Sequence, residues 1–356
     1  MIVSRTPYRI SFFGGGTDYP SWYRENGGQV LSASIDKYCY LTLRYLPPFF
    51  EHRYRVVYSK IETVSDIKEI RHPIVREALR YLSIDTSLEI HHDGDLPARS
   101  GMGSSSSFTV GLINALYALE GRMSHKQELA AKAITVEQDL VGDIVGSQDQ
   151  TAAAYGGLNH IKFHRDGRIE VRPVTVGRQR VQDLNDSLML FFTGVVRTAS
   201  DVANSYVTSL ESKARLITTM GEMAEEGLRI LGCSCDLRDF GYLLDQAWSA
   251  KRSISTAISN QYIDGIYERA KNAGAIGGKL TGAGGGGFLL LFVPPESQRK
   301  VRQTLKDLLW IPFRFEFNGS QIIFYDPDVD NFQHIKDERN ECNFGCFMEL
   351  SALKGR

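Results

Sequence analysis

Four serines follow two glycines in the segment LPARSGMGSSSSFTVGLINAL, which spans residues 96–116. The serines open an apolar pattern with helical spacing, and the glycines leave the loop before it flexible. The N–H groups of a first helical turn and the positive end of the helix dipole bind anions, while serine hydroxyls can donate to phosphate or ligate Mg²⁺. Because one serine suffices to cap a helix, the pattern favours a phosphate site. The predicted phosphate contacts are Gly101, Gly103, Ser104, Ser105 and Ser106.

A second glycine-rich loop, GGKLTGAGGGG at residues 277–287, is followed by the apolar run FLLLFV. A tight turn explains about two glycines, so this density indicates a close backbone approach to a ligand or another loop. The loop matches GxGxxG, but it lies between a helical pattern and a strand, the reverse of the order in a dinucleotide site. A P-loop is excluded because Ala273 and Leu280 stand where it needs glycine and Ser or Thr. The glycines predicted to bind nucleotide phosphate are Gly282, Gly284 and Gly285.

Carboxylates near these loops have the chemistry that phosphoryl transfer requires. The reaction needs a group that orients or deprotonates the attacking hydroxyl, a metal that joins phosphate oxygens, and positive charge for the transition state. Asp149 lies in the expected first turn of a short helix, where the dipole keeps a carboxylate ionised. A first-turn aspartate is also a common cap, and Glu137 is by default solvated on a charged helix face. Spacing alone leaves both interpretations open.

Two further polar segments are ambiguous when taken singly. RTPYRISFFGGGTDYP, at residues 5–20, predicts a strand that enters a glycine turn and presents Thr17 and Asp18. A simple hairpin turn would also explain its glycines. The cluster at residues 91–93, HHD, is better explained as a satisfied strand end than as a zinc site, because no further ligand spacing accompanies it.

Composition limits the class of protein. At 356 residues the chain suits two packed domains with a cleft between them. The 41 basic and 42 acidic residues nearly cancel, so no broad positive field favours nucleic acid or a membrane surface. No signal peptide or apolar run of membrane-spanning length is present. Five cysteines are an odd number for a disulfide framework, and we expect reduced thiols and a cytoplasmic location.

The hydrophobic pattern places these loops between strands and helices. Strands are expected, as a pair, within 28–45 and then at 87–92, 158–164, 169–174, 187–192, 288–293, 313–317 and 321–325. Helices are expected from residue 104, at 126–141 and 147–154, across 200–272 and at 296–309. This order predicts an α+β fold with domains at residues 1–175 and 176–340 and a polar tail at 341–356.

Taken in order, the three loops resemble the three motifs of the GHMP kinases, the superfamily of galactokinase, homoserine kinase and mevalonate kinase. LPARSGMGSS follows the family's PxxxGLGSS with methionine for leucine, KLTGAGGGG meets KxTGAGxGG, and TPYRISFFGGGTDYP matches the N-terminal motif. The match spans about residues 3–295. The resemblance implies ATP and Mg²⁺ as cofactors, an N-terminal domain like ribosomal protein S5 domain 2, a ferredoxin-like C-terminal domain, and a site between them.

The resemblance also implies a role for each matching residue. Asp149 would orient or deprotonate the accepting hydroxyl, with the positive charge of Arg9 beside it. Ser105 and Glu137 would hold Mg²⁺. Asp18 would bind sugar hydroxyls. The other predicted substrate contacts in the N-terminal motif are Gly15, Gly16 and Thr17.

The N-terminal motif departs from that of galactokinases, which read GEHTDY where this chain has GGGTDY. Galactose is therefore disfavoured. Together with SQDQTAAAYGG and FTGVVRTASDV, the motif resembles the D-glycero-D-manno-heptose 7-phosphate kinases, which phosphorylate the anomeric hydroxyl for nucleotide-activated heptose. A sugar phosphate of this kind needs arginines for its second phosphate. Arg197 is the first candidate, with Arg99 and Arg5 behind it, although Arg197 as a surface ion-pair residue is equally compatible.

Several alternatives stay open at this point. Another acceptor such as fucose would keep the fold, and a non-catalytic sugar sensor could be built on it. The adenine pocket is not identified, and the stretch 55–80 is its expected source. Oligomeric state is not determined, and a homodimer stays open.

Overall fold

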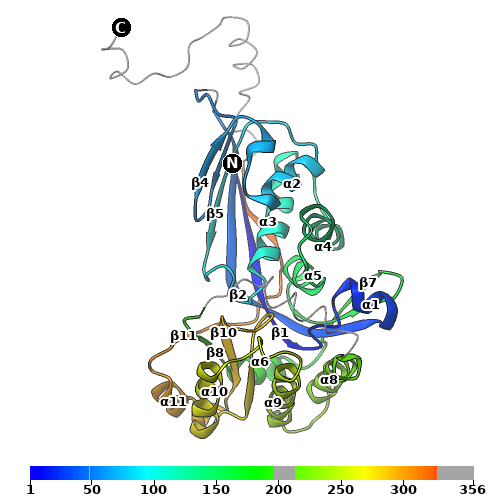
Figure 1. The fold of residues 1–356 in the computed structure, drawn as a ribbon, viewed down its shortest axis with the longest axis vertical. Coiled ribbons are helices and arrows are strands. Elements are labelled where there is room, and N and C mark those ends of the chain that lie inside the picture. Colours follow the sequence, from blue (N-terminus) through cyan, green and yellow to red (C-terminus); the bar gives the residue numbers. More distant parts are fainter. Residues whose placement is uncertain (48, 196–212, 327–356) are drawn as a thin grey trace, which may run out of the picture.

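The structure is a computed structural model that describes residues 1–47, 49–195 and 213–326. Within these residues, two β-sheets are flanked by helices (Figure 1). The eight-stranded sheet has the order β12-β1-β2-β5-β3-β4, with β6 paired to β2 and β7 to β6. Its strands are β1 (Ile2–Phe13), β2 (Gly28–Tyr45), β3 (Tyr54–Val57), β4 (Ile61–Val64), β5 (Leu88–Gly94), β6 (Leu158–Phe163), β7 (Ile169–Pro173) and β12 (Gln321–Tyr325).

Strands β1 and β2 form the long centre of this sheet. They pair antiparallel from Ile2 opposite Leu43 to Phe13 opposite Leu31. The predicted pair of strands within 28–45 is wrong, because β2 is one continuous strand. It stays extended since β1 pairs along it while β5 and β6 pair with its two halves, so no hairpin turn is needed. The end of β1 carries Arg9 and leads into the glycine turn before Asp18.

Helices α2 to α5 lie on one side of the large sheet (Figure 1). Helix α3 packs against both β1 and β2 and is buried continuously over residues 106–117, which explains its apolar composition. Because α3 is fixed on every side, the loop at its N-terminus is held in place. The bounds are α1 (Pro20–Asn26), the 3₁₀ turn η1 (Ile67–Glu69), α2 (Pro73–Tyr81), α3 (Ser104–Leu119), α4 (Lys126–Ile134), the π-helical segment η2 (Thr135–Val141) and α5 (Gln148–Tyr155).

The four-stranded sheet has the order β11-β8-β10-β9 and packs with the later helices. Its strands are β8 (Leu188–Phe192), β9 (Gly277–Leu280), β10 (Phe288–Phe292) and β11 (Leu309–Ile311). The helices are α6 (Arg178–Asp186), α8 (Ala214–Gly232), α9 (Arg238–Arg252), α10 (Gln261–Ala273) and α11 (Pro295–Thr304). Across the described ranges, none of the helices combines the length and apolarity that a bilayer crossing requires.

The end of the described chain differs from the sequence prediction. Residues 313–317 form a single bridge, Ile35 to Phe315, rather than a strand, and β11 pairs with β8 instead. Strand β12 does not join the second sheet but pairs with β1. The chain therefore returns to the first sheet, which has a free edge there for β12 to pair with. The domain limits at residues 175 and 340 stay a prediction.

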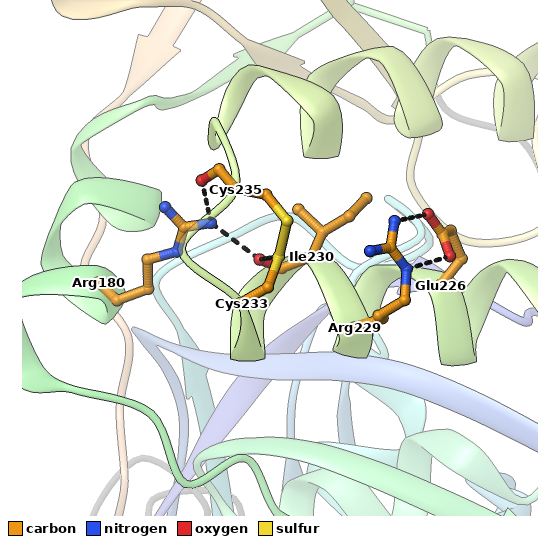
Figure 2. The surroundings of a disulfide bond; sticks show 6 residues. All are labelled: Arg180, Glu226, Arg229, Ile230, Cys233 and Cys235. Carbon is orange, nitrogen blue, oxygen red and sulfur yellow. Dashed lines mark hydrogen bonds and ion pairs between the residues drawn. A yellow bond between two sulfur atoms is a disulfide. The ribbon is translucent and has the colours of Figure 1, made fainter.

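The two cysteines between α8 and α9 are not reduced thiols, as the sequence analysis expects, but form a disulfide. Cys233 and Cys235 are joined by a disulfide, with a Cα–Cα distance of 5.3 Å (Figure 2). The guanidinium of Arg180 donates to the carbonyl oxygens of Ile230 and Cys235, which ties α6 to this turn. Cys39 is buried and free.

Candidate active site

A cavity of about 210 Å³ brings the three predicted loops together. It lies where the end of β1, the start of α3, the start of α5 and the glycine loop after β9 meet. Twelve of the residues singled out from the sequence line it, namely Arg9, Gly15, Gly16, Asp18, Arg99, Gly101, Gly103, Ser104, Ser105, Ser106, Asp149 and Gly282. Segments far apart in the chain thus meet at one site, as an anion-binding cleft requires.

The remaining predicted residues either do not line the cavity or lie outside the described residues. Thr17 is buried behind the turn, where its hydroxyl donates to the carbonyl oxygens of Gly14 and Gln29, so it supports the turn. Glu137 is buried beside the cavity rather than lining it. Arg197 lies outside the described residues, so its role stays a prediction.

The cavity contains a bidentate ion pair between Arg9 on β1 and Asp149 in the first turn of α5. Arg9 donates from Nε to Asp149 Oδ1 at 2.7 Å and from NH2 to Oδ2 at 2.6 Å. Arg9 is 3% exposed, and a third donor, NH1, reaches the carbonyl oxygen of Gly101 at 2.8 Å. The arginine thereby joins the carboxylate to the serine-rich loop. Charge-assisted, bidentate pairs of this kind hold a side chain in one orientation.

The serine-rich loop and the second glycine loop touch through their backbones. Gly101 has φ +79°, and a Cβ there would lie 2.5 Å from the carbonyl oxygen of Thr281. Gly282 has φ +66°, and its Cβ would lie 2.4 Å from the Cα of Gly101. Only glycine allows this approach in the left-handed region. The close approach predicted for the second loop is therefore made to the first loop.

The other glycines predicted to bind phosphate from this loop have protein partners. The N–H of Gly285 donates to the carbonyl oxygen of Ile258 at 2.8 Å, and Gly284 packs against the same residue. Of the three, only Gly282 lines the cavity. These contacts favour a supporting role for Gly284 and Gly285, while direct phosphate binding by Gly282 stays a prediction.

Asp18 is a buried carboxylate that lines the same cavity. Its Oδ1 accepts the N–H of Gly16 at 2.8 Å, and its side chain packs on Gly146, where a Cβ would lie 1.8 Å from Oδ2. Burial, with a smaller contribution from the negative charge of Asp149, raises the pKa of Asp18 to about 6. A buried carboxylate held this way is suited to accept hydrogen bonds from ligand hydroxyls.

The raised pKa predicts how Asp18→Asn changes stability with pH. The native carboxyl, with a pKa of about 6 against an ordinary value of 3.8, keeps a proton that the unfolded chain has already released. The free energy of unfolding of the wild type, measured relative to Asp18→Asn, therefore falls as pH rises from about 4 to about 6. The expected fall is on the order of 3 kcal/mol, to be measured by urea unfolding at several pH values. A difference that is independent of pH would contradict the assignment.

Glu137 is surrounded by neutral donors. It accepts from Ser106 Oγ at 2.9 Å and Thr109 Oγ1 at 2.6 Å, and from the side-chain amide of Gln150. Burial raises its pKa to about 7. No cation pairs with it among the described residues. A buried carboxylate without a cationic partner, next to serine hydroxyls, fits a Mg²⁺ ion that also binds phosphate oxygens. The hydroxyl bonded to Glu137 is that of Ser106, whereas Ser105 is exposed at the cavity.

Two of the three arginines considered for a second phosphate are placed by the structure. Arg99 is exposed at the cavity rim, with φ +59°. Arg5 lies outside the cavity, where it donates to Gln321 and stacks over Tyr38 at 4.6 Å. Arg5 is therefore a poor candidate, and Arg99 stays one.

Ser11, Gln148, Lys251 and Lys279 are polar residues that line the cavity and to which the sequence analysis assigned no role. Lys279 is the first residue of the matched motif KLTGAGGGG. Ser11 and Gln148 lie two and one positions from Arg9 and Asp149, so proximity in sequence was an available signal. Lys251 had none, because α9 reads as an ordinary amphipathic helix and only the packing of α9 on β9 brings it to the site.

Comparisons with known proteins agree with this geometry. The family model for the GHMP kinases N terminal domain matches residues 71–157, and that for the GHMP kinases C terminal matches residues 233–309. A D-glycero-alpha-D-manno-heptose 7-phosphate kinase from Campylobacter jejuni is 28% identical over 86% of this chain and 93% of that protein. A mevalonate kinase from Methanothermobacter thermautotrophicus is 31% identical over 71% of this chain and 83% of that protein.

A solved structure confirms the predicted α+β fold. The crystal structure of a D-glycero-D-manno-heptose 1-phosphate kinase from Bacteroides thetaiotaomicron superposes with a TM-score of 0.75. The superposition covers 91% of this chain and 99% of that protein at 23% sequence identity. At this identity the likeness establishes the shared architecture of the two chains.

Proposed function

The chain belongs to the GHMP kinase family, and from that membership we propose that it transfers the γ-phosphoryl group of ATP to the anomeric hydroxyl of D-glycero-D-manno-heptose 7-phosphate. Members of this family are phosphotransferases that use ATP, generally with Mg²⁺. The product would be the 1,7-bisphosphate, a precursor for nucleotide-activated heptose. The observation that carries the proposal is the Arg9–Asp149 pair, which faces the serine-rich loop inside one cavity.

Asp149 is the proposed catalytic residue. It would orient the acceptor hydroxyl and take its proton as the new O–P bond forms and the bond to the ADP oxygen breaks. Arg9 holds the carboxylate through both oxygens, and Asp149 Oδ2 lies close to Gly103 at the start of α3. The buried positive charge of Arg9 also stabilises charge that develops on the attacking oxygen.

The phosphates of ATP are proposed to bind at the start of α3. The N–H groups of Ser104, Ser105 and Ser106 belong to the first helical turn, which has no intrahelical acceptors. Glu137 and the neighbouring serine hydroxyls would hold Mg²⁺, which when bound would neutralise charge on the phosphate oxygens. Glu137 is a buried carboxyl that has no cationic partner among the described residues, which supports this assignment.

The adenine is proposed to lie against the stretch expected from the sequence. The ring of His72 stacks on Phe108 of α3 at 4.7 Å, and Tyr58 meets His72 edge-on at 4.9 Å. His72 Nδ1 is buried and has no hydrogen-bond partner among the described residues. An aromatic cluster at Phe108, directly after the four serines, suits a base attached to phosphates bound there.

The heptose assignment depends on the acceptor side of the cavity. Gly15 and Gly16 leave room beside Asp18 where larger side chains would fill it, and the heptose 7-phosphate kinase relative supports the substrate class. The test is a panel of acceptors with coupled detection of ADP, including heptose 7-phosphate, heptose, fucose and galactose. We expect heptose 7-phosphate to have the highest kcat/KM, by about tenfold or more, as one lost charged hydrogen bond predicts.

The position of transfer and the alternatives are decided by the same panel. A phosphorus NMR spectrum of the product should show an anomeric phosphate. A higher kcat/KM for fucose would contradict the heptose assignment. Absence of ADP release with every sugar and sugar phosphate would contradict the kinase mechanism and favour the non-catalytic sensor.

A further inference from the structure

Two buried lysines line the cavity and have no part in the transfer step described above. Lys251, on α9, is 7% exposed, and Lys279, on β9, is 4% exposed. Both line the same cavity as Arg9 and Asp18. The C-terminal half of the chain thus contributes two cations to a site whose proposed catalytic residues lie in the N-terminal half.

Backbone carbonyls hold both ammonium groups. Lys279 Nζ donates to the carbonyl oxygen of Phe12 at 2.9 Å, and Lys251 Nζ donates to that of Gly282. Over the described part of the chain, neither forms an ion pair with a carboxylate. Burial, with a smaller contribution from the positive charge of Arg9, lowers the pKa of Lys251 to about 7 and that of Lys279 well below its ordinary value. Three buried basic side chains, those of Arg9, Lys251 and Lys279, therefore line one cavity, which also contains Asp18 and the already paired Asp149.

Unpartnered polar atoms occupy the same cavity. Ser11 Oγ and Gln148 Oε1 are buried without a hydrogen-bond partner among the described residues, and these side chains are 5% and 9% exposed. They lie around Gly15, where a Cβ would be 3.7 Å from Ser11 Oγ and 3.8 Å from Gln148 Nε2. Buried polar atoms are nearly always hydrogen-bonded, so these point to a polar ligand.

We propose that Lys251 and Lys279 form a binding site for phosphoryl oxygens in the acceptor half of the cavity, with Ser11 and Gln148 binding hydroxyl groups of the same ligand. A buried ammonium is strongly disfavoured without an anion, and each retains N–H donors beyond its carbonyl contact. The assignment of the anion rests on the proposed function. Two sources share this chemistry, namely the phosphate that the sugar carries and the phosphoryl group in transfer.

The test compares Lys251→Met, Lys251→Arg and Lys279→Met with a matched control, Lys271→Met. Lys271 also donates to a backbone carbonyl, that of Ile276, but it pairs with Asp245 and lies outside the cavity. For each variant, kcat and KM are measured with heptose 7-phosphate and with unphosphorylated heptose, and the melting temperature is recorded. Should Lys251→Met not fold, Lys279→Met and Lys251→Arg decide the outcome.

The two sources predict different results. If the lysines bind the sugar's phosphate, the Met variants raise KM for heptose 7-phosphate by about 10–100-fold and leave heptose unchanged. If they bind the phosphoryl group in transfer, kcat falls by a similar factor with both acceptors while KM stays near the wild-type value. Lys251→Arg should retain part of the activity in either case. Kinetic constants in the Met variants equal to those of Lys271→Met would overturn the proposal.

A binding measurement separates this inference from the proposed function. Inorganic phosphate and pyrophosphate are titrated against the wild type and the variants while the melting temperature is followed. Stabilisation that is lost in Lys251→Met and Lys279→Met but kept in Lys271→Met supports the anion site even if no sugar is phosphorylated. Equal stabilisation of the wild type, Lys251→Met, Lys279→Met and Lys271→Met would contradict it.

Discussion

Asp149→Asn is expected to lower kcat by about 10²–10⁴ while the affinity for ATP stays close to that of the wild type. The substitution keeps the shape of the side chain but removes the oxygen that would take the acceptor's proton. It also removes the negative charge that Arg9 holds through two hydrogen bonds. The measurement is steady-state kinetics with heptose 7-phosphate, together with calorimetric titration of a non-hydrolysable ATP analogue.

A matched control is available in the π-helical segment η2, which precedes α5 in the chain. Asp139 is exposed and lies outside the cavity, so Asp139→Asn should leave kcat unchanged. The melting temperature of each variant shows whether the unpaired, buried Arg9 has disturbed the fold. Full turnover by a folded Asp149→Asn would sink the assignment of Asp149 as catalytic residue.

Gly101→Ala is expected to disturb nucleotide binding more than the small size of the added methyl group suggests. A methyl group at residue 101 would lie 2.5 Å from the carbonyl oxygen of Thr281, so the serine-rich loop or the second glycine loop must move. Crowding of this kind in a packed region typically lowers the free energy of unfolding by about 1–3 kcal/mol. The carbonyl oxygen of Gly101 accepts a hydrogen bond from Arg9, so a movement of this loop also shifts Arg9. We therefore also expect KM for ATP to rise and kcat to fall.

The control for this substitution separates backbone strain from the clash. Gly121 has φ +69°, but a Cβ there meets nothing within 4 Å. Gly121→Ala therefore has the left-handed strain, about 1 kcal/mol, without the contact. Urea unfolding and ATP kinetics of both variants give the comparison. Equal effects on stability and on KM would mean that the contact between the two loops is unimportant.

The local pattern of the sequence predicts most of the regular structure. The apolar helix after the serines, the helix that begins near Asp149 and the strand after the glycine loop all appear where periodicity and capping indicate. These elements depend on contacts within a few residues, which is the range that periodicity reports. The three motifs also resemble those of a family in order along the chain, and this is why the fold and the phosphotransferase class followed from the sequence.

Local sequence patterns could not predict which strands pair with one another. Whether residues 28–45 form one strand or two depends on β1, β5 and β6, which pair along both edges. Strand β12 has the same local pattern in either sheet, and only the free edge of β1 decides where it lies. Register and sheet membership are set by contacts between segments that lie tens to hundreds of residues apart in the sequence.

The sequence alone therefore determined the chemistry that these segments can carry out. The serine- and glycine-rich loops can bind phosphate, and the carboxylates near them supply an acidic group with a basic neighbour. Only the tertiary structure decided which groups meet. It pairs Arg9 with Asp149, bonds Glu137 to Ser106, uses the second glycine loop to support the first, and brings Lys251 into the cavity. The reason is that side-chain contacts, burial and charge depend on distances in space, which residue types and spacing along the chain do not contain.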